Sequence, residues 1–415
     1  PFLHAGAACF TFLTARRLYG AQAGFWAAML YLLMPGVTLS STLISTDALL
    51  LFWVSAMIYV WVRIREAEQA TAMEAVALGA TIGFGLLSKY AMMFVLPALG
   101  LAILFDPKTR AALLNLKGLF VLGTVAFVFS PNLIWNAQNN FATVSHTGDN
   151  ANLSDGAGIY PGEWLEFFSG QFGVFGPITF IALLIALFSA GGERRRFRVW
   201  LALMVLTPLF MISVQALISR ANANWAAAAY AAAPVLVAGW AIAGGKFRKG
   251  LVGTGLALNL LLATVPPLVM LSPTLTNQLG FANAVKRQRG WPETVKMIQT
   301  ELARGSYDAV AVDNRLMFYA LTYYGMEDSA PFFMWRYEPS ISNHAELTKA
   351  LPEDDKRVLL VSYYFETYEP YFEADFQSVT ALGRKDIELG GGKVRRLKLF
   401  EAQGYDGPRV RPLRD

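Results

Sequence analysis

Long apolar segments follow one another through the first 272 residues of this 415-residue chain. A helix rises 1.5 Å per residue, so it needs about 20 apolar residues to cross a hydrocarbon layer of ~30 Å. Ten segments approach this length, and most of them lack the polar stripe of a soluble core helix. They cover roughly residues 1–17, 21–39, 46–62, 73–88, 90–105, 118–134, 165–189, 199–218, 225–243 and 250–272. The pattern predicts a mainly α-helical, multi-helix transmembrane domain over residues 1–272.

From Pro273 onward the pattern changes to mixed polar and charged residues, with alternating runs typical of helices and strands. Helices are predicted over residues 292–303, 315–324 and 344–351, and strands over 308–312, 357–362 and 394–400. Because strands alternate with helices, we predict a small soluble α/β domain over residues 273–401 with a partly parallel sheet. Residues 402–415 are rich in Gly, Pro and Arg, and are predicted to form a flexible tail.

The composition excludes several classes of site. The chain is 55% hydrophobic and 16% charged, and its single cysteine, Cys9, excludes a disulfide scaffold or a four-thiolate metal site within one chain. The three histidines are too scattered for a metal-ligand spacing, and no HExxH, Walker A, GxGxxG or GxSxG motif is present. We therefore expect neither a cofactor nor a metal. The excess positive charge lies in residues 1–272, which contain 16 Lys and Arg but only 10 Asp and Glu. Nucleic acid is therefore not an expected partner.

Basic residues predict the orientation of the helices, because they cluster in every second connection. These are Arg16, Arg17, Arg63, Arg65, Lys108, Arg110, Lys117, Arg194, Arg195, Arg196, Arg198, Lys246, Arg248 and Lys249. By the positive-inside rule this side is cytoplasmic, so the 135–164 loop, which has no Lys or Arg, and the C-terminal domain are predicted to face outward. The same rule puts residue 1 on the outer side. We therefore expect an upstream helix, and an outer loop after it, to precede the chain as given.

Lys89 is a clear exception to this charge pattern. Segments 73–88 and 90–105 must form a hairpin, since both of their outer flanks are basic. At ~24 Å each, they are too short to reach the outer surface, so the apex that contains Lys89 and Tyr90 is predicted to be recessed in the outer leaflet. A lysine at this depth is suited to neutralise the phosphate of a lipid-linked substrate, with Tyr90 as a neighbouring binding residue. The alternative is a lysine that extends to the lipid headgroups.

Asp47 begins an apolar helix on the same outer side, after Ser45 and Thr46. Asp is a favoured residue at helix starts, because its negative charge interacts favourably with the helix dipole, and this purely structural role is one interpretation. The functional alternative is an outward-facing carboxylate that orients an acceptor or assists proton removal. We keep Asp47 as a candidate catalytic residue.

A short polar connection near residue 220 supplies a second set of candidates. Arg220 is the other basic residue in the outer connections, and Asn222, Asn224 and Trp225 follow it. These side chains are suited to phosphate, sugar hydroxyls and the apolar face of a sugar ring, although Arg and Trp are also ordinary interfacial anchors.

The outer 135–164 loop has a composition that suits hydroxyl-rich ligands. It contains Asn136, His146 and several carboxylates, without a compensating cation. Its length and glycine content predict a mobile flap, with Asn136 and His146 as candidate substrate contacts. A solvated loop of the same composition is the alternative.

Six segments of the chain resemble glycosyltransferase family 39 of bacteria. They are TDALLLFW, GFGLLSKYAMM, SPNLIWNAQNNF, ANANWAAAAY, GWPETV and DNRLMFYALTYYG. The similarity is to the polyprenyl-phosphate-dependent branch, which includes protein O-mannosyltransferase-like enzymes and lipid A aminoarabinose transferases. It covers most of the chain.

The resemblance implies a GT-C membrane fold in the bacterial inner membrane, with a periplasmic C-terminal domain. It implies a sugar donor carried on polyprenyl phosphate, and a lipid, glycan or protein acceptor. Transfer would take place on the periplasmic face, with inversion at the anomeric carbon.

The resemblance also assigns roles to single residues. Asp47 matches the second acidic position of the family, and Lys89 matches its lysine near the lipid phosphate. Arg220, Asn224 and Trp225 match a recurrent Asn-Trp connection. The principal acidic motif of the family lies in the first outer loop, which precedes this sequence. We therefore expect the principal catalytic carboxylate upstream, and the chain as given to be inactive.

A secondary transporter or flippase is the alternative function, since such proteins also use many helices, broken segments and a few intramembrane charges. The absence of an internal sequence repeat, the scarcity of ionisable residues within the segments and the outer α/β domain favour the glycosyltransferase.

Overall fold

The computed structural model describes residues 1–139, 141, 143, 148, 158–189 and 195–411. Two compact units divide the chain, Pro1–Pro267 and Leu268–Asp415. The division falls close to the change of sequence pattern at residue 273. We call them the membrane unit and, after the location that the charge pattern predicts for it, the outer unit.

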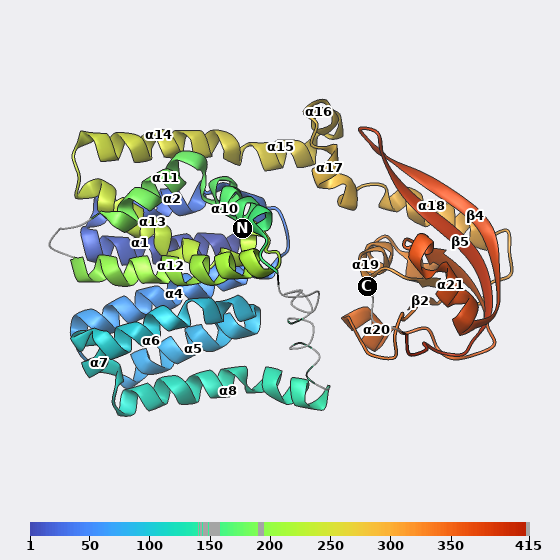
Figure 1. The fold of residues 1–415 in the computed structure, drawn as a ribbon, viewed down its shortest axis with the longest axis horizontal. Helices are drawn as coiled ribbons and strands as arrows, with labels where there is room; N and C mark the ends of the chain where they lie inside the picture. Colours follow the sequence, from blue (N-terminus) through green and yellow to red (C-terminus); the bar gives the residue numbers. More distant parts are fainter. Residues whose placement is uncertain (140, 142, 144–147, 149–157, 190–194, 412–415) are drawn as a thin grey trace. The chain divides into compact units, whose positions relative to one another are not determined.

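Helices make up the described part of the membrane unit (Figure 1). They are α1 (Phe2–Tyr19), α2 (Ala21–Leu32), α3 (Pro35–Ser41), α4 (Thr46–Ala67), α5 (Ala72–Ser88), α6 (Leu96–Phe105), α7 (Pro107–Leu113), α8 (Leu116–Gln138), α10 (Pro161–Phe175), α11 (Pro177–Phe188), α12 (Arg195–Ile218), α13 (Ala229–Ile242), α14 (Lys246–Ala263) and α15 (Val265–Leu271). Two 3₁₀ turns, η1 (Tyr90–Phe94) and η2 (Ala223–Ala226), interrupt them.

Four helices are long and apolar enough to cross a membrane, and three bent pairs bring the number to seven if each pair is one span. The four are Thr46–Ala67, Leu116–Gln138, Phe197–Ile218 and Lys246–Leu271. The bent pairs are Ala21–Leu32 with Pro35–Ser41, Tyr90–Phe105 with Pro107–Leu113, and Pro161–Phe175 with Pro177–Phe188. Together with α1, α5 and α13, they place helix at each of the ten predicted apolar segments.

The apolar segment predicted over residues 165–189 forms two helices, α10 and α11, which meet at 106°. Gly176 lies at the bend with φ +95°, a conformation that residues with a side chain rarely adopt. Pro177 follows it and starts α11, because its missing N–H is not needed at a helix start. The Gly176-Pro177 pair therefore accounts for the break between α10 and α11.

A buried ion pair ties three helices of the membrane unit together. The guanidinium of Arg65, near the end of α4, donates to both carboxylate oxygens of Asp106 at 2.8 and 2.9 Å. Asp106 precedes α7 and caps it by accepting from the Thr109 N–H, and the ring of Phe197 in α12 lies 4.0 Å from the guanidinium. Both charged side chains are at most 4% exposed.

We predict that Arg65→Ala lowers the stability of the membrane unit by about 3–5 kcal/mol, because it leaves the Asp106 carboxylate buried without its partner. Arg63→Ala is the matched control, since Arg63 lies on the same helix in an exposed pair with Glu74 and should cost less than about 1 kcal/mol. Denaturation midpoints of the detergent-purified variants measure both. Equal losses in the two variants would contradict the role of the buried pair.

The outer unit contains helices and a five-stranded sheet (Figure 1). Its elements are α16 (Pro273–Gln278), α17 (Ala282–Val285), η3 (Lys286–Gln288), α18 (Trp291–Leu302), β1 (Ala309–Val312), α19 (Arg315–Tyr323), η4 (Met326–Asp328), β2 (Phe332–Met334), α20 (His344–Thr348), β3 (Arg357–Ser362), α21 (Phe365–Asp375), β4 (Phe376–Gly390) and β5 (Lys393–Tyr405). The strand order is β2-β1-β3-β5-β4, with β1 parallel to β2 and β3, and β5 antiparallel to β3 and β4. The predicted partly parallel sheet is confirmed.

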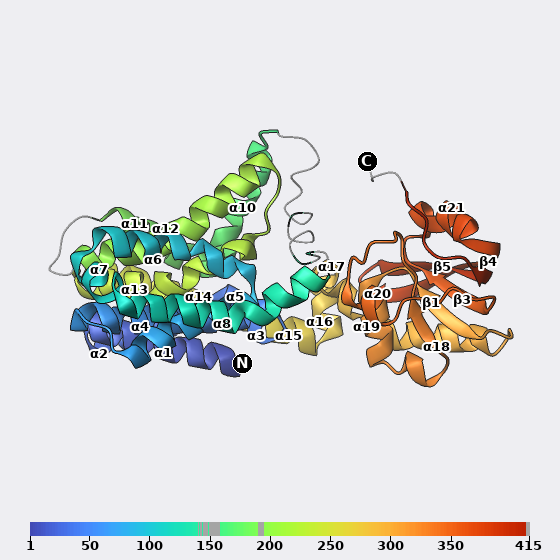
Figure 2. The ribbon, with the colours of Figure 1, turned by 90° about the horizontal axis from the view of Figure 1, so that it is seen from below.

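Helices cover both faces of this sheet, and Figure 2 shows α18 and α21 on opposite sides. One apolar cluster joins α18 and α19 to one face of the strands, and a second joins α21 to the other face. The sequence analysis missed β2, β4 and α21, and ended the last strand too early. β5 continues to Tyr405, so residues 402–405 belong to the sheet rather than to a tail.

The predicted tail is also held further along by Arg411. Its guanidinium donates to the buried carboxylate of Asp375 and lies 4.5 Å from the ring centre of Tyr371. An ion pair of this kind, with both side chains at most 4% exposed, orders the chain up to residue 411.

Asp313 joins the ends of β1 and β3. Its buried carboxylate accepts from the hydroxyl of Ser362 at 2.5 Å and from the backbone N–H groups of Tyr363 and Tyr364. Burial raises the pKa of Asp313 to about 6, although these hydrogen bonds act in the opposite direction.

The raised pKa predicts a pH-dependent stability of the outer unit. Because the folded-state pKa of Asp313 lies above the unfolded value, the folded state binds more protons between about pH 4 and 6, so the free energy of unfolding falls as pH rises through this window. Asp313→Asn removes this contribution, which amounts to roughly 3 kcal/mol. Urea unfolding, followed by pulsed hydrogen exchange of β1 and β3, measures the free energy of unfolding of the outer unit at each pH. Parallel pH profiles of the two proteins would show that Asp313 does not titrate there.

Candidate functional site

The two candidate charges Asp47 and Lys89 meet in the structure. Asp47 lies in the first turn of α4, and Lys89 lies between the end of α5 and the 3₁₀ turn η1. The Lys89 Nζ is 2.5 Å from Asp47 Oδ1. The side chains are 28% and 16% exposed, so the pair is reachable from outside but largely desolvated.

Asn224 completes this cluster from a third element. It lies in η2, and its Nδ2 donates to the second oxygen of Asp47, Oδ2, at 2.9 Å. Gln171 and Tyr230 hold this turn in place. The Gln171 Nε2 donates to the carbonyl of Ala223 at 3.3 Å, and the Tyr230 hydroxyl donates to Gln171 Oε1 at 2.7 Å. Both oxygens of the Asp47 carboxylate therefore have a partner from another part of the unit.

A second polar cluster begins at Tyr90, the neighbour of Lys89. The Tyr90 hydroxyl donates to Asn132 Oδ1 at 2.7 Å, and Asn136 Nδ2 approaches the same oxygen at 3.2 Å. Asn136 is 2% exposed, and its Oδ1 accepts from the backbone N–H of Thr143. Asn136 thus holds Thr143 to α8, and it lies in this helix rather than in the predicted 135–164 loop, because α8 continues to Gln138. The sequence analysis missed Asn132, whose spacing of four residues from Asn136 places both on one face of α8.

The remaining candidates make no hydrogen bond to the charge pair in the described part of the chain. Arg220 and Asn222 are exposed, and Trp225 is half-buried against the apolar cluster around Phe167. Within the described residues, no hydrogen bond or ion pair links these three side chains to Asp47 or Lys89. His146 lies outside the described residues. Among the described residues, no group of three His, Cys, Asp or Glu side chains suits a metal ion.

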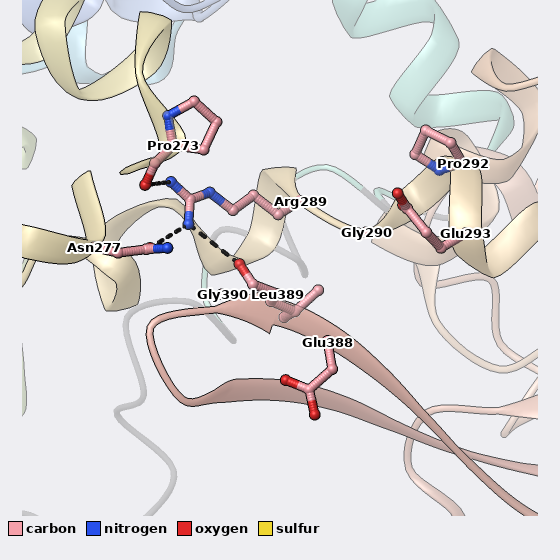
Figure 3. Close-up of a pocket in the computed structure, with 9 residues that line it drawn as sticks. All are labelled: Pro273, Asn277, Arg289, Gly290, Pro292, Glu293, Glu388, Leu389 and Gly390. Carbon is pink, nitrogen blue, oxygen red and sulfur yellow. Dashed lines mark hydrogen bonds between the residues drawn. The ribbon is translucent and has the colours of Figure 1, made fainter. Parts of the chain in front are cut away.

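A cavity of about 370 Å³ lies in the outer unit beside the turn between β4 and β5 (Figure 3). Its lining residues are Pro273, Asn277, Arg289, Gly290, Pro292, Glu293, Glu388, Leu389 and Gly390. The Arg289 guanidinium donates to Asn277 Oδ1 at 2.7 Å and to the carbonyls of Leu389 and Pro273. The Arg289 N–H groups already donate to acceptors of the same unit. We therefore interpret the residues around the cavity as a structural contact that holds the β4–β5 turn against α16.

We therefore take the cluster of Asp47, Lys89 and Asn224 as the candidate functional site of the membrane unit. It combines an ammonium group, a carboxylate and an amide at the ends of apolar elements. An ammonium group binds an anion such as phosphate, and a carboxylate accepts a proton from a hydroxyl. The arrangement can therefore serve a transfer reaction in which an anion departs and a hydroxyl attacks.

Comparison with known proteins places the chain in a family. Residues 4–135 match the family described as dolichyl-phosphate-mannose-protein mannosyltransferase. The lipid A galacturonosyltransferase RgtD of Rhizobium johnstonii is 33% identical over 362 residues, which cover 85% of this chain and 73% of that protein. The chain belongs to this family of membrane glycosyltransferases. The predicted resemblance to glycosyltransferase family 39 is thereby confirmed, and the transporter alternative gains no support.

Solved structures agree with the family at the level of the fold. ArnT from Cupriavidus metallidurans bound to undecaprenyl phosphate matches with a TM-score of 0.58 and 14% identity, over 98% of this chain and 84% of that one. Its apo state matches with a TM-score of 0.59 and 15% identity, over 96% and 82%. The predicted GT-C membrane fold with a small α/β domain is confirmed.

Proposed function

We propose that this glycosyltransferase moves a sugar from a polyprenyl-phosphate donor to a lipid acceptor of the lipid A type on the periplasmic face of the bacterial inner membrane. The observation that supports it most directly is the contact of Lys89 with Asp47 at the end of two short apolar helices. The related protein RgtD is named for action on lipid A, and the ArnT structure holds undecaprenyl phosphate. A lipid-borne phosphate is the anion that an ammonium group at this position suits.

In the proposed reaction, the donor phosphate takes over the Lys89 ammonium from Asp47. The acceptor hydroxyl oxygen attacks the anomeric carbon from the side opposite the phosphate, and a new C–O bond forms with inversion. The bond between the anomeric carbon and the phosphate oxygen breaks, and polyprenyl phosphate leaves with the electron pair. The acceptor proton passes to a carboxylate, a role that we assign to Asp47 with Asn224 as its orienting partner.

The remaining candidates take supporting roles in this proposal. Arg220 is a second cation for the donor phosphate, and Asn222 and Trp225 are contacts for the sugar. Tyr90, held by Asn132, borders the phosphate position beside Lys89. Asn136 acts on the 135–164 loop, in which His146 is a proposed substrate contact.

We predict that Lys89→Ala lowers kcat by about 10²- to 10³-fold, because negative charge that develops on the leaving phosphate loses its fixed cation. Lys89→Arg should retain part of the activity, and Asp47→Asn should lower kcat by about 10²- to 10⁴-fold. Release of polyprenyl phosphate from the sugar donor measures turnover in the purified full-length enzyme.

Lys108→Ala is the matched control for these variants. Lys108 forms a 2.5 Å pair with Glu68 like that of Lys89 with Asp47, but in an exposed connection among the predicted cytoplasmic basic residues. We expect wild-type turnover from it. Full activity of Lys89→Ala, or movement of the donor without cleavage of its sugar–phosphate bond, contradicts the proposed reaction.

The periplasmic orientation can be tested through the single cysteine of the chain. In a Cys9→Ser background, Asn222→Cys is expected to react with a membrane-impermeant maleimide added to spheroplasts, because the η2 connection is proposed to face the periplasm. Lys246→Cys, at the start of α14, should react only after the membrane is opened. The reverse labelling pattern refutes the orientation.

A further inference from the structure

His4 of α1 is part of a buried polar network that reaches the start of α4. The His4 side chain is 2% exposed. Its Nδ1 lies 3.0 Å from the hydroxyl of Tyr31 in α2, and its Nε2 lies 3.1 Å from Ser40 Oγ in α3. Ser40 Oγ is in turn 3.4 Å from the Oγ of Ser45, the residue that precedes α4. One imidazole thus joins α1, α2 and α3 to the connection that leads to Asp47.

The connection that this network holds has few apolar anchors. α3 is only seven residues long and bends by 60° from α2. Between α3 and α4, Leu43 is 41% exposed and Ile44 is fully exposed. The Ser45 side chain makes no capping bond to α4. The link from Ser40 to Ser45 is therefore a direct polar restraint on the residues immediately before Asp47.

We propose that His4 is a positioning residue for sugar transfer, which holds the α3–α4 connection so that Asp47 meets Lys89 and Asn224 in a fixed geometry. The inference rests on the function proposed above for Asp47. A buried imidazole needs hydrogen-bond partners for its ring nitrogens, so its two bonds hold α2 and α3 at fixed positions around α1. Small displacements of a catalytic group have large effects on rate, because the reacting atoms must be aligned.

Two substitutions break the network at different points in the full-length enzyme. His4→Phe keeps an aromatic ring of similar size but removes both hydrogen bonds, and Ser40→Ala removes only the link between His4 and Ser45. We expect each to lower kcat by ~10- to 10²-fold, with the KM for the polyprenyl-phosphate donor within about twofold of wild type. His4→Gln, whose amide can replace a ring nitrogen, should recover kcat to within about threefold of wild type.

Thr11→Val is the matched control on the same helix. Thr11 is 1% exposed, and its hydroxyl donates to the carbonyl of Ala7 within α1, so its loss reports only a general packing defect. We expect unchanged kcat from this variant. Thermal denaturation midpoints verify that each variant is folded, and the half-buried Ser40 provides the deciding variant if His4→Phe does not fold.

The outcomes separate this inference from the proposed function. Wild-type kcat in Ser40→Ala, or an equal loss of kcat in Thr11→Val, overturns the role of His4 while Asp47→Asn still shows its predicted loss of kcat. If Asp47→Asn keeps full activity, the assignment of the site itself is wrong, and the positioning role falls with it. A donor KM that rises in parallel with the loss of kcat would also overturn it, since it would place His4 in donor binding.

Discussion

An ammonium group at the edge of an apolar layer requires a counter-charge, and this requirement organises the site. Lys89 ends α5 and is followed by a 3₁₀ turn, so its side chain leaves the helix where two short apolar elements meet. Its counter-charge comes from Asp47, 42 residues earlier, at the start of α4. Without this partner, the lysine would bear the full cost of desolvation at that depth. The pair therefore fixes where the hairpin apex and α4 meet.

The same pair is also suited to exchange its partners. Lys89 and Asp47 neutralise each other in the absence of a ligand, so the site is not a strong isolated cation. In the proposed reaction, a lipid-borne phosphate replaces the carboxylate at Lys89 and sets Asp47 free to accept a proton. Binding of the donor thus frees the Asp47 carboxylate to act as a base when the acceptor attacks. Asn224 keeps its hydrogen bond to the second oxygen, which preserves the orientation of Asp47 during this exchange.

The sequence allowed much of this site to be predicted, because charges stand out in apolar segments. Asp47, Lys89 and Asn224 were all identified as candidates, and the ten apolar segments are helical. Their contacts were not predictable from periodicity, since Asp47 and Asn224 are 177 residues apart. Asn132 was missed because it is uncharged and follows a proline inside an apolar helix. In the outer unit, Pro370 obscured α21, and the largely exposed β4 lacks the buried alternation of a core strand.

The surroundings of Asp47 show how an apolar helix bundle holds a candidate catalytic carboxylate in place. Asn224 reaches one oxygen from a turn that Gln171 of α10 and Tyr230 of α13 hold, and the start of α4 is tied to α1 through Ser40. These supports reach Asp47 through hydrogen bonds that do not involve Lys89. In the proposed reaction, they keep the carboxylate in position when the donor draws Lys89 away. Preorganised electrostatics requires such fixed groups, because a charge that relaxes during the reaction stabilises the transition state less.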